Sequence, residues 1–550
     1  IGNTATVTAL SGTAIKATGG ANNSVTNAGA VIGDVDLGAG TSAFTNLGNA
    51  LFAPNSIVNL GGATLTNRGT VDLGGTGNVV TTALTGSFVQ TPGGTLSFDV
   101  RFGSLPTDVL DVSGTAAVRG HVAPHVLSLV PNQTVTFLNT TGGFTGPEDA
   151  RPVNTPVITY GLHYVGNTLQ LSVNKVNFTP PGFASGLNAN QTNIANYMQM
   201  TWNTGVPSGL AAAMGYLANF TSGAGYAAAL DQLTPQPYLS QQTGAMMTGL
   251  GFLDGMMSCR GPDGPLAPLR ERDCTWFRFT GGVTNQQSGA DTLGYREAGE
   301  LYQVGVQQQV APNWFRGFGT SFDSARTTTT SSVINSQRGD IGLSVKHEVG
   351  NWLFAGGLDL GVATLDSNRS IDTATGTASA KSQSSIWHAD ARFRAVYLLE
   401  SGRNYAKPSV DFDLIQLYMP GFSEYGAGPL NLDVHSSSQT VAVVSPNLEM
   451  GTTIPGEDAN VVARPYVSSG FSVFSNNSWS ATSTLAGAPS GIGAFNTSTS
   501  FPGTIFKASA GVEFISGKKT NAFDLRFGYD GQFASGYQSH TGSVKAIWRF

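Results

Sequence analysis

Residues 542–550 read Gly542-Ser543-Val544-Lys545-Ala546-Ile547-Trp548-Arg549-Phe550, an alternation of apolar and polar side chains with the period of a β-strand. The apolar side chains share one face of that strand: Val544, Ala546, Trp548 and Phe550. The polar ones fall mostly on the other face: Ser543, Lys545 and Arg549. A strand that faces lipid on one side and a polar lumen on the other has this pattern, and so does a strand of a soluble β-sandwich.

The connections between strands separate these two folds. From Thr275 to Phe550 the chain divides into twelve alternating strands, with short turns at 312–313, 350–351, 401–403, 456–458 and 517–519. Longer polar stretches lie near 284–293, 324–337, 366–380, 420–433, 475–503 and 534–540. This strict short-long rhythm is typical of an outer-membrane β-barrel with tight periplasmic turns and long external loops. A sandwich would not require it. We therefore predict a twelve-stranded antiparallel transmembrane barrel, closed by pairing of the last strand with the first.

Charged residues within these strands are expected to line a hydrated lumen, because a charge at the bilayer midplane costs about 2 to 4 kcal/mol. The predicted lumen-facing residues are His388, Asp390, Arg392, Arg394, Asp411, Asp413, Asp524 and Arg526. They would brace the barrel wall or, alternatively, grip a polypeptide in the pore. Four tryptophans near strand ends are expected at the membrane interface: Trp276, Trp314, Trp352 and Trp548.

The composition of the chain agrees with an all-β, exported protein. Charged residues make up 11% of its 550 residues, against roughly a quarter in ordinary soluble domains. The 71 glycines favour turns over helices, and the net charge of −6 argues against nucleic acid as a partner. No run of 18 apolar residues occurs, which excludes a helical membrane protein. Ile1 is not followed by a signal-peptide pattern, so either a signal peptide has been removed or the chain begins inside a longer protein. We expect the second, because the repeats described below are already under way by Ala21.

Residues 1–92 contain an internal repeat with a period near 20. The pattern T-N-x-G begins at Thr26, Thr45 and Thr66, and the pattern V-D-L-G begins at Val35 and Val71. A repeat of this length, rich in Gly, Asn and Thr and without helical periodicity, predicts stacked β-coils with Asn or Gly at their corners. The alternative is a low-complexity linker.

Residues 93–173 continue the strand-rich pattern and carry a resemblance. The stretch G-G-T-L-S-F-D-V at 93–100, followed by D-V-L-D-V-S-G-T-A at 108–116, resembles the end of the passenger in the autotransporter (type V secretion) family of Gram-negative bacteria. The resemblance implies a pertactin-like, right-handed β-helix whose last segment acts as a cap and an autochaperone.

Residues 174–274 change in composition. Pro180-Pro181 breaks the strand pattern, and alanine-rich stretches follow at 210–217 and 226–233. Between 238 and 257 one helical face carries Leu239, Met246, Leu250, Leu253 and Met257. Glycines make this helix thin, which suits a helix in a narrow pore, although an ordinary packed helix fits as well. The stretch 229–238 resembles the family's linker, whose last helix passes through the barrel.

The resemblance implies a function for the whole chain: a barrel at 275–550 that exports its own N-terminal passenger to the bacterial surface. It implies outer-membrane lipid, the barrel-assembly machinery and periplasmic chaperones as partners, and an adhesin or virulence role with a host-surface ligand. Phe550, Trp548, Ala546 and Val544 would form the assembly signal. Some members of the family cut the passenger at an Asn pair inside the pore, and no such pair occurs between Asn174 and Thr275. Two alternatives are a surface enzyme, a protease or esterase whose catalytic part lies upstream of residue 1, and a simple outer-membrane pore.

Other candidate sites are few, and we expect no catalytic, cofactor or metal site in this fragment. Cys259 and Cys274 are predicted to form a disulfide, because an even cysteine count in an exported protein favours one; the alternative is two unpaired thiols in a mobile loop. His121 and His125 are spaced four apart, but Pro124 and the strand context argue against a shared metal. Arg338-Gly339-Asp340 spells an integrin-recognition tripeptide, but a chance match or a lumen-facing pair is the favoured interpretation. No G-x-S-x-G motif is present.

Overall fold

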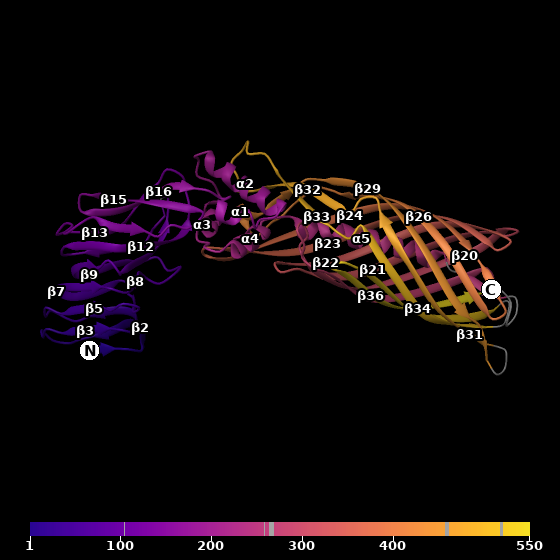
Figure 1. The fold of residues 1–550 in the computed structure, drawn as a ribbon, viewed down its shortest axis with the longest axis horizontal. Helices are drawn as coiled ribbons and strands as arrows, with labels where there is room; N and C mark the ends of the chain where they lie inside the picture. The colour runs from indigo at the N-terminus through magenta and orange to yellow at the C-terminus, as the bar shows by residue number, and fades with distance from the viewer. Residues whose placement is uncertain (104, 258, 263–268, 457–460, 517–520) are drawn as a thin grey trace.

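A computed structural model describes the chain from residue 1 to residue 550 except for residues 104, 258, 263–268, 457–460 and 517–520. The molecule is elongated, with a stack of short strands at its N-terminal end, helices in the middle and a barrel at its C-terminal end (Figure 1). Within the described residues, no helix is long and apolar enough to cross a membrane.

The N-terminal part is a β-solenoid in which strands pair in parallel with strands one coil away, so the period near 20 is confirmed as a coil repeat. Asn27 lies beside Asn46, which lies beside Asn67. The strands are β1 (Gly2–Asn3), β2 (Thr6–Lys16), β3 (Ser24–Asn27), β4 (Ala30–Asp36), β5 (Ala43–Asn46), β6 (Leu51–Ala53), β7 (Ile57–Asn67), β8 (Thr70–Asp72), β9 (Thr81–Gln90), β10 (Thr95–Arg101), β11 (Val109–Val112) and β12 (Ala116–Ser128).

The interior of the solenoid explains the T-N-x-G pattern. The buried asparagines form a ladder in which Asn27 Nδ2 donates to Asn46 Oδ1 at 2.8 Å and Asn46 Nδ2 donates to Asn67 Oδ1 at 3.0 Å. Beside the ladder, the rings of Phe44 and Phe52 stack at 4.5 Å, and both are fully buried. Because a buried amide must have hydrogen-bond partners, each asparagine requires the coil on either side of it.

The last strands of the solenoid change from parallel to antiparallel pairing. These strands are β13 (Thr134–Thr140), β14 (Asp149–Pro152), β15 (Ile158–Val165) and β16 (Thr168–Val176). β13 and β14 still pair in parallel with β11 and β12. β13 also pairs antiparallel with β16, and β16 pairs antiparallel with β15. This hairpin ends the coil stack and therefore caps it.

Among the residues that the structure describes between the solenoid and the barrel, five segments form helices: α1 (Pro181–Ala184), α2 (Ala189–Asn203), α3 (Ala211–Ala218), α4 (Gly223–Asp231) and α5 (Gln236–Met256). α2 begins with a capping box between Asn188 and Gln191. α3 packs on β12, where the amide of Leu129 donates to the carbonyl of Ala211 at 2.9 Å. The alanine-rich stretches are thus α3 and α4.

The C-terminal part is a closed antiparallel barrel of twelve strands, as predicted. The strands are β19 (Cys274–Gln286), β20 (Tyr295–Ala311), β21 (Trp314–Thr328), β22 (Ser332–Val349), β23 (Trp352–Thr373), β24 (Gly376–Tyr397), β26 (Asn404–Met419), β29 (Ser437–Thr452), β31 (Val461–Phe474), β34 (Thr504–Ser516), β35 (Ala522–Ala534) and β36 (Tyr537–Arg549). β36 pairs with β19 along its whole length, with Trp548 beside Thr275, so closure uses the edge of the last strand.

Short elements lie at both ends of the barrel. One end carries β17 (Arg260–Pro262), β18 (Leu269–Glu271), β25 (Leu399–Ser401) and β30 (Ile454–Pro455). At the end nearer the solenoid, a separate four-stranded sheet, here called the mouth sheet, contains β27 (Phe422–Ser423), β28 (Leu432–Val434), β32 (Ser478–Leu485) and β33 (Phe495–Ser500). The 3-10 helix η1 (Gly428–Leu430) lies between β27 and β28.

Three of the expected long connections differ from the prediction. The stretches 324–337, 366–380 and 534–540 are mostly strand, and the hairpins turn at 329–331, 374–375 and 535–536. Their polar composition reflects strands that continue beyond the apolar band into water. The stretches 420–433 and 475–503 do contain long insertions, which form the mouth sheet. The expected turns at 456–458 and 517–519 fall largely outside the described residues.

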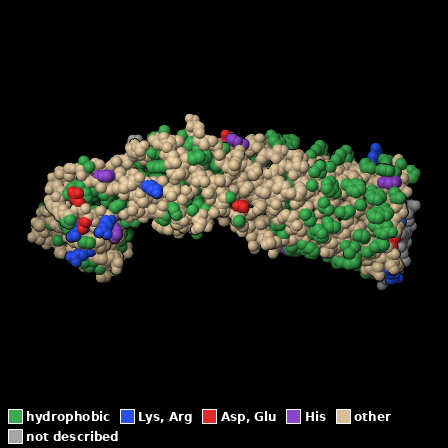
Figure 2. All heavy atoms as spheres, turned by 45° about the horizontal axis from the view of Figure 1, so that its top comes forward, with side chains coloured by type: hydrophobic (Ala, Val, Ile, Leu, Met, Phe, Trp, Pro, Cys, Tyr) green, Lys and Arg blue, Asp and Glu red, His purple; other side chains and the backbone are tan. Residues whose placement is uncertain are grey.

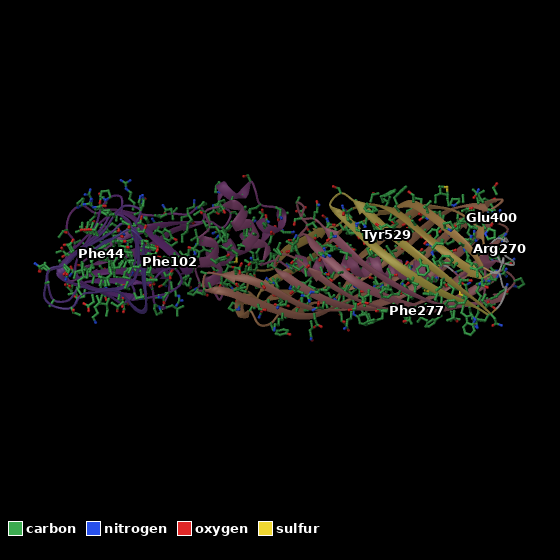
Figure 3. All side chains as sticks on the ribbon, turned by 90° about the horizontal axis from the view of Figure 1, so that it is seen from below. Phe44, Phe102, Arg270, Phe277, Glu400 and Tyr529 are labelled. Carbon is green, nitrogen blue, oxygen red and sulfur yellow. A yellow bond between two sulfur atoms is a disulfide. The ribbon has the colours of Figure 1, made fainter. Side chains whose placement is uncertain are left out.

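The outer face of the barrel is apolar. Side chains alternate along each strand, and on β23 the exposed Leu358 and Leu360 flank the buried Asp359. Figure 2 shows hydrophobic side chains gathered in a broad band over the barrel, and Figure 3 places Phe277 and Tyr529 on its outside. A band of this kind suits lipid and not water.

Three of the four tryptophans fit the predicted interface, and one does not. Trp314, Trp352 and Trp548 are 43%, 45% and 55% exposed on the outside. Trp276 is 3% exposed and points into the barrel, where Lys545 Nζ lies 4.4 Å from the centre of its ring. The prediction for Trp276 is wrong because its place in the strand alternation assigns it to the inner face.

Candidate functional site

The helix α5 lies inside the barrel and is held there by polar contacts from the wall. Arg338 Nη1 donates to Thr248 Oγ1 at 3.3 Å, and Lys545 Nζ donates to the carbonyl of Gly255 at 2.9 Å. A Cβ on Gly249 would lie 2.2 Å from Asp390 Oδ2, so this glycine is needed for close approach to the wall. Residues 236–256 thus form a slim plug in the lumen, the arrangement that its glycines suggest.

All eight residues predicted to face the lumen lie on the inner side of the barrel. Most of them form ion pairs with one another or with neighbouring strands. Arg394 Nη2 lies 2.7 Å from Asp254 Oδ1 of α5 and its Nε lies 2.6 Å from Asp411 Oδ1, so it joins the plug to the wall. The remaining pairs include Arg392 with Asp413 at 2.5 Å, Arg526 with Glu513 at 2.8 Å and Arg549 with Asp524 at 2.7 Å.

Further charged residues line the lumen: Arg338 and Asp340, the pair for which the sequence offered a lumen-facing position, and Asp359 of β23, which the sequence interpretation missed. Arg338 is 3% exposed and pairs with Glu297 and Asp323, each at 3.1 Å. Asp340 is 2% exposed. The Arg338-Gly339-Asp340 tripeptide therefore faces the lumen and presents no integrin-recognition surface. The same alternation that identified 387–397 is present on β22 and β23 and would have identified these residues.

A cavity remains beside the plug. A cavity of about 430 Å³ lies between α5 and the wall, lined by Gly251 and Asp254 of the helix and by charged wall residues such as Lys407, Glu449 and Arg526. The lumen is therefore narrowed by α5 but not packed to the density of a protein core.

The mouth of the barrel is closed by a buried ion-pair cluster. Arg369 of β23 pairs with Glu424, which also accepts a hydrogen bond from Tyr238 Oη at 2.5 Å. Arg369 Nη1 donates to the carbonyl of Gln232, between α4 and α5. Trp479 of the mouth sheet donates through Nε1 to Thr243 Oγ1 of α5 at 2.7 Å. The wall, the mouth sheet and the linker helices thus hold one another.

The opposite end of α5 is anchored covalently. Cys259 and Cys274 form a disulfide with their Cα atoms 6.3 Å apart, which joins the segment after α5 to the first residue of β19. Glu271 lies nearby, 3.0 Å from Lys346 Nζ and 3.1 Å from Arg260 Nε. In Figure 3, Arg270 and Glu400 mark this end of the barrel.

In the solenoid, the histidines do not converge. His121 is exposed, and His125 Nδ1 lies 2.7 Å from Asp99 Oδ1. Asp108, of the D-V-L-D-V motif, accepts backbone hydrogen bonds from Val80 and Asp99, each at 2.6 Å. Burial raises the pKa of the Asp108 carboxyl to about 7, although these two hydrogen bonds act in the opposite direction. The motif thus ties two coils together at the end of the stack.

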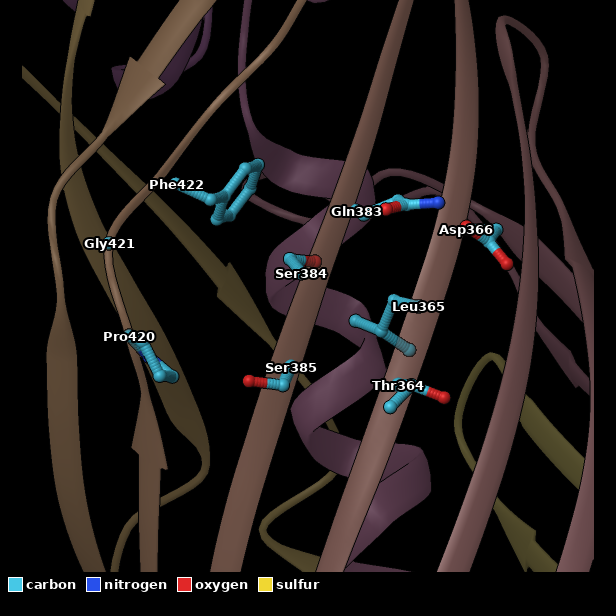
Figure 4. Close-up of a pocket in the computed structure, with 9 residues that line it drawn as sticks. All are labelled: Thr364, Leu365, Asp366, Gln383, Ser384, Ser385, Pro420, Gly421 and Phe422. Atoms are coloured by element: carbon cyan, nitrogen blue, oxygen red, sulfur yellow. The ribbon is translucent and has the colours of Figure 1, made fainter.

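A second cavity lies on the barrel exterior. About 400 Å³ in volume, it is lined by nine residues of β23, β24 and the start of the mouth insertion (Figure 4): Thr364, Leu365, Asp366, Gln383, Ser384, Ser385, Pro420, Gly421 and Phe422. It is shallow and open, and its lining contains one carboxylate with amide and hydroxyl groups.

Comparison with known proteins identifies the barrel. The family model for the autotransporter β-domain matches residues 275–530. The translocator domain of the autotransporter NalP from Neisseria meningitidis is similar at 16% identity, over 56% of this chain and 97% of that one, with a TM-score of 0.43. The β domain of the Bordetella autotransporter BrkA is similar at 13% identity, over 51% of this chain and 100% of that one, with a TM-score of 0.38. No curated protein matches the chain.

Proposed function

Because residues 275–530 are an autotransporter β-domain, which lies in the bacterial outer membrane and exports a passenger to the cell surface, we propose that the β-solenoid of residues 1–176 is this passenger. The observation that best supports the proposal is the position of α5. This helix runs inside the barrel and joins the solenoid side of the chain to β19. If the solenoid is exported through this barrel, the segment that follows it should remain in the lumen, which is where α5 lies.

The order of folding follows from the parallel pairing of coils. The cap at β13–β16 lies next to the linker, so it leaves the barrel before the coils that precede it in sequence. Each earlier coil then finds a formed coil on which to pair, and the burial of its side chains favours further export without a nucleotide. The Phe98 and Phe137 rings, stacked at 4.3 Å, belong to this early part, whereas Phe44 and Phe52 belong to the late part.

A matched pair of core truncations tests this proposal. F137A and F44A each remove one buried, stacked ring, at opposite ends of the solenoid. Surface exposure of an epitope tag inserted between Gly19 and Gly20 is measured on intact cells by antibody binding and added protease. F137A, near the cap that leaves the barrel first, should strongly reduce surface exposure of the tag, and F44A should reduce it less. If the unaltered chain keeps its tag inside cells whose barrel is inserted, the export proposal fails.

Assembly of the barrel is proposed to depend on the last strand. Val544, Trp548 and Phe550 are 38%, 55% and 44% exposed on the outer face. With Ala546 they offer the barrel-assembly machinery an apolar edge, while periplasmic chaperones would shield that edge before insertion. Crosslinking from a photoreactive residue at position 550 during assembly should capture the insertion machinery.

We propose adhesion to a host-surface ligand, rather than catalysis, as the role of the passenger segment in this chain. The outer faces of its strands are polar, as on β9, where Thr81 and Thr85 are exposed. Cells displaying the chain should bind host-cell surfaces more than cells displaying the barrel alone. Equal binding by the two kinds of cell would favour the alternative of a surface protease or esterase encoded upstream of residue 1. This enzyme alternative is tested by measuring hydrolysis of peptide and ester substrates by cells that display the longer chain.

A plain diffusion pore is the remaining alternative. It requires an open lumen, whereas α5 occupies this one. Single-channel conductance should therefore increase when residues 174–273 are deleted. A large, steady conductance that is the same with and without them would support the pore instead.

A further inference from the structure

Four side chains of the barrel wall converge at one place beneath the plug. Asp340 lies on β22, Asp359 on β23, and His388 and Asp390 on β24. The strand register puts Asp340 and His388 on either side of Gly361, and Asp359 directly beside Asp390. All four side chains face the lumen and are 4% exposed or less.

Two glycines create the space in which they meet. A Cβ on Gly361 would lie 2.3 Å from Asp340 Oδ1 and 2.5 Å from His388 Nε2, so the bare backbone allows these two groups to approach across it. A Cβ on Gly249 of α5 would lie 3.0 Å from His388 Nε2 and 3.2 Å from Asp359 Oδ2. The helix therefore covers the cluster without inserting a side chain into it.

The distances within the cluster suit metal coordination. His388 Nε2 lies 3.1 Å from Asp340 Oδ1 and 3.2 Å from Asp359 Oδ2, and the three ligand atoms all lie within 4.8 Å of one another. Ligands at about 2.0 Å from a tetrahedral zinc ion are separated by roughly 3.3 Å. The second oxygen of Asp340, Oδ2, accepts a hydrogen bond from Ser321, which orients the carboxylate.

Asp390 provides an independent indication that something binds here. It is 2% exposed, and neither of its carboxylate oxygens has a hydrogen-bond partner among the described residues. Its Oδ2 points to the space beside Gly249 that His388 Nε2 and Asp359 Oδ2 also border. A buried carboxylate without a partner is costly, so this arrangement calls for a cation.

The charges around the cluster strengthen the argument. Elsewhere in the lumen, carboxylates pair with arginine or lysine, as Asp413 does with Arg392 and Glu449 with Lys407. The three aspartates of the cluster form no such pair among the described residues, and their one basic neighbour within bonding distance is His388. With all three carboxylates ionised, the cluster carries a net negative charge whether or not the imidazole is protonated.

We propose that Asp340, Asp359 and His388 bind a divalent transition-metal cation of the zinc or manganese class in the barrel lumen, with Asp390 completing or supporting its coordination. A mixed nitrogen and oxygen ligand set favours these ions over calcium or magnesium. Nε2 of His388 binds the ion as neutral imidazole, and its proton passes to solvent. The ion would link β22, β23 and β24 under α5 and so stiffen the wall that the plug contacts.

Metal content of the full chain, purified from outer membranes in detergent, tests the proposal. Chelator-stripped protein is loaded with Zn²⁺, dialysed and analysed for metal, and in parallel it is titrated with Co²⁺ while visible absorption is recorded. The unaltered chain should retain one Zn²⁺ per molecule and show the intense absorption of four-coordinate Co²⁺. H388Q should lose both, and D390N should weaken Co²⁺ binding about tenfold or more.

The control variant is E513Q, which removes a lumen carboxylate that pairs with Arg526 outside the cluster. E513Q should bind the metal as the unaltered chain does. Heat-modifiable gel mobility confirms that each variant is a folded barrel. If H388Q does not fold, Co²⁺ binding by D390N and the Co²⁺ spectrum of the unaltered chain still test whether the metal site exists. The proposal is overturned if the unaltered chain does not retain stoichiometric Zn²⁺, or if D390N retains as much Zn²⁺ as the unaltered chain. The cluster would then be explained by a protonated His388 that the aspartates share.

Discussion

Asn46 lies in the middle of the asparagine ladder and is hydrogen-bonded to the coils before and after it. N46A would leave Asn27 Nδ2 and Asn67 Oδ1 buried without their ladder partner. Each such group costs about 1–3 kcal/mol, so we expect the passenger to lose roughly 3 kcal/mol of stability. Chemical denaturation followed by circular dichroism measures this loss. N78A, at an exposed side chain, should change the stability little, and equal effects of the two would contradict the role of the ladder.

Asp108 should make the passenger less stable as the pH rises. Its folded pKa of about 7 exceeds the usual value near 3.8, because burial disfavours the carboxylate. A group whose pKa is raised on folding stabilises the folded state fully below its unfolded pKa, and this contribution is lost as the pH rises through the folded pKa. We expect the melting temperature to fall between about pH 4 and pH 7, and this fall to be smaller in D108N. D111N, three residues further along the chain on β11, serves as the control, and an unchanged pH profile in D108N would refute the assignment.

At the scale of elements, the fit of α5 to the wall depends on one of its glycines and not on another. A Cβ at position 249 would lie 2.2 Å from Asp390 Oδ2, whereas one at position 251 would meet nothing within 4 Å. G249A should therefore destabilise the plugged barrel by about 1–3 kcal/mol, the usual cost of overpacking. G251A should be neutral or should stabilise the helix by about 0.5–1 kcal/mol. The temperature at which gel mobility changes on heating distinguishes them, and identical shifts would argue against close packing at residue 249.

The two faces of β36 should respond differently to charge. Val544 faces lipid and is 38% exposed, and Ser543 borders the lumen cavity. V544R should cost about 2–4 kcal/mol in the membrane and reduce the amount of folded barrel, while S543R should be tolerated. Quantifying folded barrel in outer-membrane fractions checks this, and normal assembly of V544R would contradict the lipid-facing assignment.

At the scale of the whole molecule, Glu424 joins the barrel mouth to the linker. E424Q would leave Arg369, which is 1% exposed, without its charge partner, at a cost of about 3–5 kcal/mol. We expect faster hydrogen exchange at residues 223–235, because Arg369 also holds the carbonyl of Gln232. E400Q, at the exposed far end of the barrel, is the control. Unchanged exchange in E424Q would show that the junction is held by other contacts.

Local alternation was sufficient to predict the wall of the barrel. Along β24 and β36, neighbouring residues fall on opposite faces, so lipid-facing and lumen-facing positions follow directly from sequence. The ladder position of Asn27 and Asn46 was predictable in the same way, from the period of the repeat. The prediction for Trp276 is wrong because an aromatic residue near a strand end indicates the membrane interface by its type alone, whereas the alternation along β19 places it on the inner face.

Apart from the closure of the barrel by its first and last strands, contacts between distant segments could not be predicted. The stretch 366–380 is polar either as a loop or as a solvated strand, and composition does not distinguish the two. The mouth sheet pairs segments from separate insertions, and the cluster of Asp340, Asp359 and His388 depends on the register of three strands. Such registers are determined by the closed barrel as a whole.

The disulfide between Cys259 and Cys274 has a mechanical consequence for a passenger under load. Fourteen residues separate the two cysteines, and a chain of this length could extend to roughly 50 Å. The disulfide holds their Cα atoms 6.3 Å apart and so removes nearly all of that slack. A pull on the exposed solenoid is then transmitted through α5 directly to β19 and the sheet hydrogen bonds around it. Force on the passenger therefore does not extend the segment between the two cysteines, and the barrel acts as a rigid anchor.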